Sequence, residues 1–309
     1  MVAATSFEFK EYVASRREIV ENRLREYLSG SEPEVLWESM RYSVLGGGKR
    51  LRALLCLASA DALNPDALEL AVPCACAIEM VHAMSLIHDD LPALDNDDLR
   101  RGRPTNHKVF GEALALLAGD ALLVLASETV LEQTPADVGR SVVIEVALEL
   151  ARAAGAAGMV GGQVEDMAFT GLAKRPQELV TGAMLESMHR RKTGALIRFS
   201  TWSGARLAGA DESRLRAFAR FGEVVGLAFQ ITDDLLDVTG DAKVLGKTPG
   251  KDEASDKATW VRLHGVDQSR AKLADLESEG KALLSSSGLL SGATSMLGSL
   301  LEYAIHRLS

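Results

Sequence analysis

The chain has 309 residues, of which 43 are acidic and 34 are basic, so its formal net charge is −9. Nucleic-acid-binding proteins usually have a basic surplus or a basic face, and this acidic balance argues against a general nucleic-acid partner. Hydrophobic residues make up 47% and charged residues 25%, which is typical of a soluble globular protein. An anionic ligand would have to be bound by local clusters of basic residues or by metal ions.

Cysteine usage and the N-terminal residues indicate the compartment. Cys56, Cys74 and Cys76 lie in Ala/Leu-rich surroundings, which is typical of buried free thiols in a reducing compartment. No other soft ligand lies near the Cys74-x-Cys76 pair, which argues against a zinc site. Residues 1–20 lack a continuous apolar core and an Arg/Ser-rich transit pattern, so we expect a cytoplasmic protein. A mature, processed protein of the plastid stroma is the alternative.

Apolar residues recur at spacings of three and four along most of the chain, beginning with residues 35–45. Residues 113–131 are the most apolar stretch, but a Gly–Asp pair interrupts it, so we expect a buried helix of a soluble protein and no membrane span. Residues 212–238 predict a long helix, and the Ser/Gly-rich residues 282–298 predict a helix–loop–helix. No alternating run bounded by turns indicates a substantial sheet. We therefore expect an all-α, single-domain bundle of about ten or more helices that spans residues 1–309.

The most unusual segment is "LIHDDLPALDNDDLRRGRP", residues 86–104. It holds five aspartates and then three arginines: Asp89, Asp90, Asp95, Asp97, Asp98, Arg100, Arg101 and Arg103. Like charges at this density repel one another unless counter-ions lie between them. A second acidic cluster, Asp233, Asp234 and Asp237, follows Gln230 in an otherwise apolar helical pattern. The helical spacing places the first and last of these three aspartates on one face.

Either acidic cluster alone could be a solvated helix face. Two such clusters in apolar helical contexts favour a metal site, because carboxylates inside an apolar helix cost free energy unless they are solvated, paired or bound to cations. Carboxylate oxygens without nearby thiols suit Mg²⁺, which usually shares its coordination shell with water and a substrate phosphate. The segment after Asp95 lacks the glycine and the later glutamate of an EF-hand loop, which excludes that kind of calcium site.

Basic residues near both clusters supply the other half of a phosphate site. They are Lys49, Arg50, Arg52, Arg100, Arg101, Arg190, Arg191, Lys192, Lys247, Lys251 and Lys257, with Thr193 beside them. Arginine gives bidentate contacts to phosphate oxygens, and lysine supplies a mobile positive charge. The glycine-rich segment 46–52 does not match a Walker loop, so we do not expect an ATPase.

These segments resemble the trans-isoprenyl diphosphate synthases, the enzymes that elongate prenyl chains head to tail. The resemblance extends from about residue 35 to about residue 260 and includes "GGGKRLR", "DDLPALD", "RRGRPTNH", "GGQVEDM", "KTGAL", "FQITDDLLD" and "LGKTPGKD". Within this family, residues 80–112 are most similar to the plant and cyanobacterial geranylgeranyl diphosphate synthases. The resemblance implies an all-α isoprenoid synthase fold around a central cavity, and a homodimer.

The resemblance also implies a role for individual residues. Mg²⁺, with three ions expected when substrate is bound, would be held on one wall by Asp89, Asp90 and Asp95, and on the facing wall by Asp233 and Asp237 with support from Asp234. These six aspartates and Lys192 are the expected catalytic residues. The allylic diphosphate (dimethylallyl, geranyl or farnesyl) would be bound by Arg100, Lys192, Thr193, Gln230, Lys247 and Lys257. Isopentenyl diphosphate would be bound by Lys49, Arg52, His82 and Arg101. Gln163 and Asp166 match further family positions near the metals.

The implied reaction explains why such groups are needed. Ionisation of the allylic C–O bond leaves a carbocation and a diphosphate, whose charge is stabilised by metal ions and cationic side chains. The double bond of isopentenyl diphosphate attacks the cation, and the departed diphosphate is the expected base for the proton that is lost. An apolar tunnel would shield the cation from water.

Three positions carry separate expectations. Ala53 stands where the family usually has a proline, which would fix the backbone, and we expect a minor effect on the loop. His82 lies on the same helical face as Asp89, and we expect it to contact substrate, although a lone helical histidine is more often structural. His88 has no family role, so we expect it to pack or to hydrogen-bond within the bundle.

Product length is expected to depend on Met84 and Ser85, which precede Asp89 by five and four positions. One helical turn is about 5.4 Å, so these side chains would lie just below the metal site. In the family an aromatic residue here blocks the tunnel and gives farnesyl diphosphate, whereas Met and Ser leave more depth. We expect geranylgeranyl diphosphate, with farnesyl diphosphate as the alternative because methionine is flexible and not small.

Three other functions fit parts of the pattern. A terpene cyclase also uses an aspartate-rich helix and Mg²⁺, but it would ordinarily have a different second metal motif and no need for Lys49 and Arg52. A non-catalytic subunit of a heteromeric prenyl synthase would tend to lose one aspartate motif, and both are intact here. An Mg²⁺-dependent phosphatase would release inorganic phosphate without making a longer chain.

Overall fold

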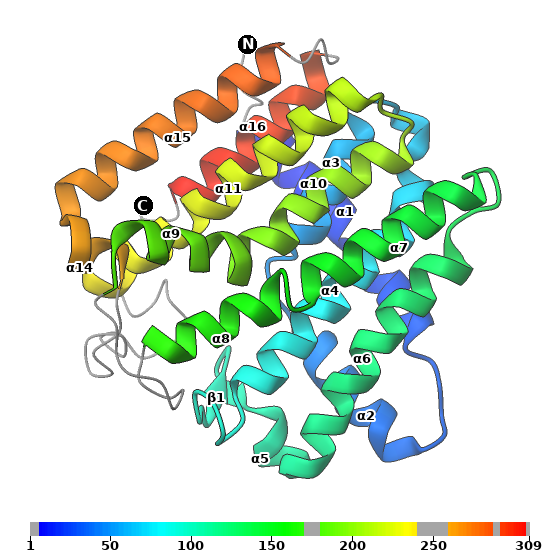
Figure 1. Cartoon of the computed structure of the whole chain (residues 1–309). Coiled ribbons are helices and arrows are strands. Elements are labelled where there is room, and N and C mark those ends of the chain that lie inside the picture. Colours follow the sequence, from blue (N-terminus) through cyan, green and yellow to red (C-terminus); the bar gives the residue numbers. More distant parts are fainter. Residues whose placement is uncertain (1–5, 170–179, 240–258, 287–290, 307–309) are drawn as a thin grey trace.

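The structure is a computed structural model that describes residues 6–169, 180–239, 259–286 and 291–306. Its elements in chain order are α1 (Ser6–Tyr27), α2 (Glu34–Val44), α3 (Leu51–Asp61), η1 (Pro65–Ala67), α4 (Leu68–Asp89), β1 (Leu99–Arg100), β2 (Arg103–Pro104), α5 (Asn106–Phe110), α6 (Glu112–Gln133), α7 (Arg140–Ala154), α8 (Met159–Phe169), α9 (Gly182–His189), η2 (Arg190–Gly194), α10 (Ala195–Leu207), α11 (Glu212–Thr239), α14 (Trp260–His264), α15 (Val266–Ser286) and α16 (Ser291–Ile305). The prediction of an all-α bundle of more than ten helices is confirmed (Figure 1).

The predicted helices agree closely with the observed ones. Residues 35–45 correspond to α2 and residues 212–238 to α11, and the predicted helix–loop–helix corresponds to the end of α15 and the start of α16. Strands β1 and β2 are the only strands in the described part of the chain, and they pair antiparallel with Arg100 opposite Arg103. This short hairpin follows the first acidic cluster directly and positions its arginines.

The core consists of two clusters of buried apolar side chains that meet at α3 and α10. One cluster surrounds α4 and includes side chains from α1, α2, α6 and α7. The other surrounds α11 and includes side chains from α14, α15 and α16. Helices α3 and α10 contribute to both clusters, and α10 packs against α3, α4 and α11 (Figure 1). Helix α10 therefore packs against both of the helices that carry the acidic clusters.

Helix α4 is buried over most of its length and ends at the first acidic cluster. Apolar residues lie on all its sides, as is typical of a helix in the middle of a core. Its buried residues run from Ala71 to Ile87, and Pro73 is tolerated near its start. The helix ends at Asp89, and Pro92 follows shortly after, where it cannot continue a helix. The acidic cluster thus begins where the buried helix reaches the surface.

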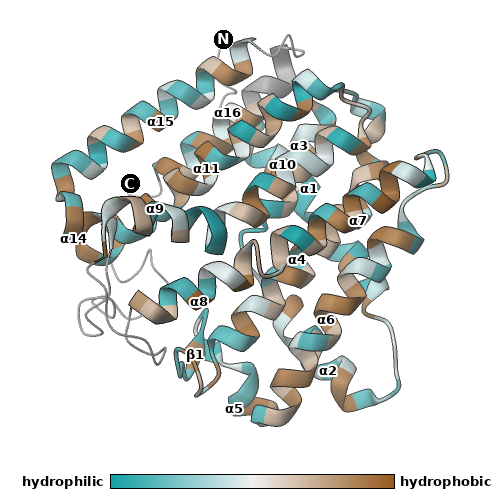
Figure 2. Cartoon of the chain, viewed as in Figure 1, coloured by the Kyte–Doolittle hydropathy of each residue, from teal (hydrophilic) through white to brown (hydrophobic). Residues whose placement is uncertain are grey.

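The prediction that residues 113–131 form a buried helix is only half right. Helix α6 covers the segment, but several of its large apolar side chains are exposed: Leu116, Leu117, Leu123 and Val124. Helix α7 also exposes Ile144 and Leu148. Figure 2 shows hydrophobic segments along both α6 and α7. Among the described residues, 65–89 and 112–133 form helices long and apolar enough to cross a membrane, with 78% and 39% of the apolar window buried inside the protein. Composition indicated the helix but not which of its faces the rest of the fold covers.

All three cysteines are free and buried. Burial raises the pKa of the Cys74 and Cys76 thiols well above the ordinary value, so both are protonated at neutral pH. The prediction of buried, unreactive thiols is confirmed, and these residues take no part in the site described below.

Candidate active site

The first acidic cluster is folded into a tight turn at the end of α4. The backbone N–H of Asp95 donates to the carbonyl of Asp89 at 2.8 Å, and the N–H of Asp97 donates to the carbonyl of Asp90 at 3.2 Å. These bonds fold the chain back so that the backbone of Asp95 meets that of Asp89 at the helix end. Burial, aided by the negative charges of Asp95 and Asp166 and opposed by nearby cations, raises the pKa of Asp89 from 3.8 to about 6. This carboxylate is therefore in a position where a bound cation would be stabilising.

Asp90 is the partner of an arginine on the hairpin. Its carboxylate is buried and accepts hydrogen bonds from Arg100 on β1, at 3.0 Å from Nε and also from Nη2. Asp97 lies 3.4 Å from the same guanidinium. Asp90 thus fixes the arginine of the hairpin relative to the end of α4.

The second acidic cluster also contains one aspartate that is buried and hydrogen-bonded within the protein. Asp233 and Asp237 are partly buried on α11, whereas Asp234 is buried. The Asp234 carboxylate accepts hydrogen bonds from Gln230 Nε2 at 3.0 Å and from the backbone N–H of Trp260 at 2.7 Å. Asp234 therefore holds the start of α14 against α11, and the prediction that it supports its two neighbours agrees with this position.

A π-helical turn, η2, lies between α9 and α10 and carries "RRKTG". π-turns widen a helix locally, and they occur frequently at functional sites. Here the turn directs two adjacent side chains to different helices. Lys192 Nζ donates to Asp166 Oδ2 on α8 at 2.5 Å, and Thr193 Oγ1 donates to Gln230 Oε1 on α11 at 3.0 Å. Asp166, whose role the sequence left uncertain, is thus the partner of Lys192.

A glycine permits the close approach of α8 to this turn. A Cβ atom on Gly162 would lie 2.2 Å from the backbone nitrogen of Lys192, closer than any real Cβ contact. Gln163 follows directly, and Asp166 lies one turn further along the same helix. The "GGQVEDM" segment was predicted to lie near the metal site, but the need for this glycine only became apparent from the packing.

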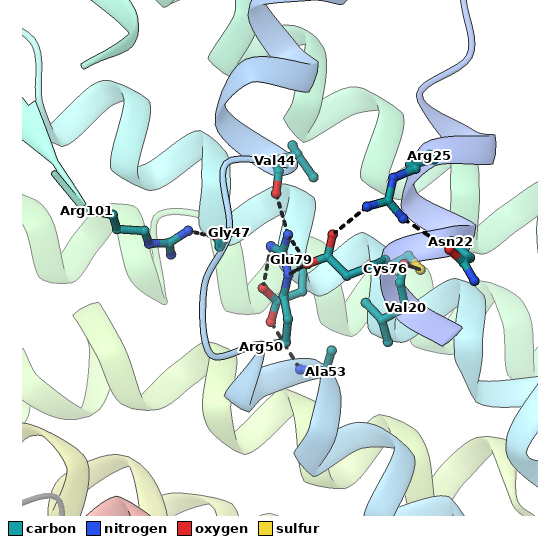
Figure 3. A network of polar contacts seen from close by, with 11 residues as sticks. Val20, Asn22, Arg25, Val44, Gly47, Arg50, Ala53, Cys76, Glu79 and Arg101 are labelled. Atoms are coloured by element: carbon teal, nitrogen blue, oxygen red, sulfur yellow. Dashed lines mark hydrogen bonds and ion pairs between the residues drawn. The ribbon is translucent and has the colours of Figure 1, made fainter. Parts of the chain in front are cut away.

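The residues predicted to bind isopentenyl diphosphate come from the glycine turn, α3, α4 and the hairpin. Three glycines precede Lys49, and Gly47 and Gly48 adopt positive φ angles of 91° and 139°. Lys49 is exposed, and its ammonium lies 5.6 Å from the ring centre of Tyr303 on α16. Arg101, itself at φ 54°, donates a hydrogen bond to the Gly47 carbonyl, which links the hairpin to the glycine turn (Figure 3).

His82 lies among arginines. Burial and the positive charges of Arg52, Arg101, Arg50 and Arg100 hold the pKa of His82 well below 6.5, so the imidazole is neutral at pH 7. A small open pocket of about 50 Å³ is lined by His82, Asp90, Arg100, Arg101 and Arg103, together with Arg50 and Glu79. This concentration of positive charge around a neutral imidazole is suited to a diphosphate.

The remaining predicted residues lie partly in the described structure and partly outside it. Arg50, first counted among the phosphate-binding basic residues, is buried and lines this pocket, and its guanidinium is ion-paired with Glu21 and Glu79. Met84 is buried in the hydrophobic core around α4. Ser85 is partly buried, and its hydroxyl donates to the His82 carbonyl at 2.9 Å. His88 Nε2 lies 3.1 Å from the Leu116 carbonyl of α6, in agreement with a hydrogen-bonding role. Lys247, Lys251 and Lys257 lie outside the described residues.

The family model for polyprenyl synthetases matches residues 33–282. The chain belongs to the polyprenyl synthetase family. It is 50% identical over 279 residues to a dimethylallyltranstransferase of Fischerella ambigua, a match that covers 89% of this chain and 78% of that protein. It is 44% identical to a chloroplastic geranylgeranyl pyrophosphate synthase of Catharanthus roseus, with 91% and 77% covered.

Solved structures agree with this assignment. A FPP/GFPP synthase of Zymomonas mobilis in its apo form has a TM-score of 0.85 and 35% identity, with 97% of this chain and all of that chain covered. The resemblance inferred from the motifs is therefore confirmed, and the chain is a prenyltransferase that elongates prenyl chains. Polyprenyl synthetases generally use Mg²⁺, and they use isopentenyl and allylic diphosphates as substrates.

The carboxylates of this polyprenyl synthetase suit Mg²⁺ only when other ligands complete its shell. Within the described ranges, no group of three or more Asp, Glu, His or Cys side chains is close enough to bind a metal ion alone. The donors are pairs of carboxylates on two helices, which are hard oxygen ligands. Mg²⁺ commonly takes one or two carboxylates, several waters and substrate phosphate oxygens. The donor set therefore fits a metal that binds together with a diphosphate.

Proposed function

We propose that this chain condenses isopentenyl diphosphate head to tail with dimethylallyl, geranyl and farnesyl diphosphates, and that geranylgeranyl diphosphate is its main product. The observation that carries the proposal is the position of η2 between the two acidic clusters. Lys192 carries a positive charge that acts on Asp89 at the end of α4, and Thr193 is hydrogen-bonded to Gln230 on α11. One turn of helix thus joins both clusters into a single anion-binding site.

In this proposal the six aspartates divide into two kinds. Asp89 and Asp95 on α4, with Asp233 and Asp237 on α11, would hold Mg²⁺, for which three ions are proposed in the substrate complex. When bound, Mg²⁺ supplies Lewis-acid stabilisation of the leaving diphosphate. Asp90 and Asp234 act as supports, because their carboxylates accept hydrogen bonds from Arg100 and from the Trp260 N–H.

The cationic side chains have separate tasks in the two half-sites. Arg100 and Lys192, with Thr193 and Gln230, bind the allylic diphosphate and stabilise the charge that it gains as the C–O bond breaks. Lys247 and Lys257 are proposed to bind the same group, although they lie outside the described residues.

Lys49, Arg52, His82 and Arg101 hold isopentenyl diphosphate so that its double bond faces the allylic cation. Burial and the surrounding arginines lower the pKa of His82, so its imidazole is neutral and donates one N–H to the diphosphate.

The proposed product length rests on α4. Met84 precedes the metal-binding end of the helix by five residues and carries no aromatic ring, which leaves depth for a longer prenyl chain. The Catharanthus roseus relative is named for the same product. Farnesyl diphosphate is the second candidate, because the buried Met84 side chain is large enough to close the tunnel early.

A homodimer is also proposed. Helices α6 and α7 expose several large apolar side chains, among them Leu117, Val124, Ile144 and Leu148. Apolar patches of this kind on a folded chain are typical of protein–protein interfaces. The buried reduced cysteines support a reducing compartment, and we propose the cytoplasm.

Incubation of the purified protein with Mg²⁺, dimethylallyl diphosphate and isopentenyl diphosphate, followed by separation of products by chain length, tests the proposal. Geranylgeranyl diphosphate is the expected product. A farnesyl product would retain the reaction class and overturn the assigned length. Absence of condensation with both substrates and Mg²⁺ present would refute the synthase function of the isolated chain and favour a subunit of a heteromeric enzyme.

A further inference from the structure

Glu79 is a buried carboxylate on α4 with no role in the proposed reaction. It lies one helical turn before His82, and only 2% of its surface is exposed. A buried charge is costly unless it is paired and hydrogen-bonded. Both of its oxygens are used: Oε2 lies 3.3 Å from Arg50 Nη1, and Oε1 accepts the backbone N–H of Ala53 at 3.2 Å (Figure 3).

The partner of Glu79 has an unusual backbone. Arg50 adopts a left-handed conformation, with φ 53° and ψ 30°, immediately before α3. Residues with side chains rarely adopt this conformation unless surrounding contacts hold them there. Those contacts are present: Arg50 Nε donates to Glu21 Oε1 at 2.8 Å and Nη2 donates to the Val44 carbonyl at 2.6 Å, while Glu79 pairs with Nη1.

The contacts of the Arg50 side chain help to fix the positions of Lys49 and Arg52, which lie close to it in the sequence. With the Arg50 side chain held by these contacts, Lys49 on one side is exposed, and Arg52 on the other side is in the first turn of α3, where it acts on His82. Lys49 and Arg52 are proposed ligands of isopentenyl diphosphate, and His82 is carried by the same helix as Glu79. The ion pair between Arg50 and Glu79 therefore connects the two parts of that half-site.

Ala53 strengthens the connection. A proline at this position, as the family usually has, would have no N–H to donate. In this chain the Ala53 N–H is one of the first-turn donors of α3, which have no partner within the helix, and Glu79 accepts it. The carboxylate of Glu79 thus binds both a side chain and the backbone of the segment that carries Lys49 and Arg52.

We infer that Glu79, acting through Arg50, is a positioning residue that fixes Lys49 and Arg52 relative to His82 and thereby sets the affinity for isopentenyl diphosphate. This inference rests on the proposed function, because it requires those three residues to bind that substrate. The allylic diphosphate is bound by other elements, α11 and η2 among them, so the effect of Glu79 is specific to one of the two substrates.

The test is the kinetics of Glu79→Gln with each substrate varied in turn. The KM for isopentenyl diphosphate is expected to rise about tenfold, whereas the KM for dimethylallyl diphosphate stays within about twofold of the wild-type value. Asp61→Asn is the matched control, since Asp61 is also a buried carboxylate paired with an arginine, Arg16, but at the far end of α3. The control should leave both KM values unchanged.

A second variant decides the outcome if Glu79→Gln does not fold. Glu21→Gln weakens the hold on Arg50 but leaves its pair with Glu79, and it should raise the KM for isopentenyl diphosphate about threefold without affecting the allylic KM. Equal rises for both substrates, or no rise in the folded variants, would overturn the inference. If the wild-type protein condenses the two substrates but the variants do not raise the KM for isopentenyl diphosphate selectively, only the positioning role is refuted. If the wild-type protein is inactive, the proposed function itself is refuted.

Discussion

Lys192 Nζ lies 2.5 Å from Asp166 Oδ2, and this ion pair joins η2 to α8 beside the end of α4. Asp166 is buried, and the positive charge of Lys192 also acts on Asp89. The pair therefore holds the ammonium within the acidic cluster, at the place where a diphosphate would need a cation. From the sequence alone, the adjacent Arg191 could equally have been the cation that binds the diphosphate. In the structure, Arg191 is exposed and pairs with Glu165 at 3.1 Å.

Lys192→Gln should lower kcat by about a hundredfold, because a cation that stabilises the leaving group is lost in the transition state. Arg191→Gln is the matched control, and it should change kcat by less than about threefold, as is usual for an exposed ion pair. Steady-state rates of isopentenyl incorporation measure both. Similar losses in the two variants would contradict the assigned role of Lys192.

Gly162→Ala should reduce both stability and activity. Its Cβ would meet the Lys192 backbone nitrogen at 2.2 Å, so α8 and η2 must separate. Overpacking of this kind typically costs about 1–3 kcal/mol. Gly139→Ala is the control, because a Cβ there meets nothing within 4 Å and its φ is −54°. Urea unfolding and condensation rates should both distinguish the two variants; a Gly162→Ala protein with wild-type values would show that the close packing has no consequence.

Mg²⁺ dependence should change with pH around the pKa of Asp89. In the metal-free protein this pKa is raised to about 6, chiefly by burial. Below pH 6 the carboxyl holds a proton that Mg²⁺ must displace, so the apparent metal affinity should fall by up to about tenfold per pH unit. The Mg²⁺ concentration that gives half the maximal rate, measured at pH 5.5 and 7.5, should be several-fold higher at the lower pH. Equal values would contradict a metal-binding role for this group.

The same raised pKa has a consequence for stability. Because the pKa is higher in the folded chain than its ordinary value of 3.8, the folded state binds the proton more tightly than the unfolded one. This contribution to the free energy of unfolding is fully present below pH 3.8 and is lost as the pH rises through about 6. Addition of Mg²⁺ with diphosphate should restore stability at neutral pH.

Met84→Phe should shorten the product from geranylgeranyl to farnesyl diphosphate, because an aromatic ring five residues before Asp89 fills the space that the growing chain needs. Met84→Leu conserves volume and should leave the product length unchanged. Chromatography of the products of both variants measures the effect. A Met84→Phe enzyme that still makes the longer product would place the length-determining residue elsewhere.

The sequence predicted the helices and both acidic clusters, because helical periodicity and charge spacing are local properties. It could not separate Asp89 from Asp90, and it could not name the partner of Asp234, because the contacts of these side chains depend on residues such as Arg100 and Trp260 that lie elsewhere in the chain. Nor does any residue pattern in "RRKTG" reveal a π-turn, which is set by how α8 and α11 pack around it.

Other differences have the same origin. The neighbours of Arg50 in "GGGKRLR" suggest a phosphate ligand, yet two glutamates and a backbone carbonyl already bind its buried guanidinium. The composition of α6 predicts a buried helix, but the packing of the neighbouring helices determines which of its faces is covered. Glu79 carried no signal of its own, because a single glutamate in an apolar helix is meaningful only when its partners are known.

The central claim is that the clusters on α4 and α11 act as one catalytic site. Its most direct test is the condensation rate of Asp89→Asn, Asp233→Asn and the double variant. Residues that act as one unit give strongly non-additive losses, so each single variant should lose about a thousandfold in kcat and the double variant hardly more than either. Losses that multiply in the double variant, or a single variant that retains near wild-type activity, would show that the two clusters work independently.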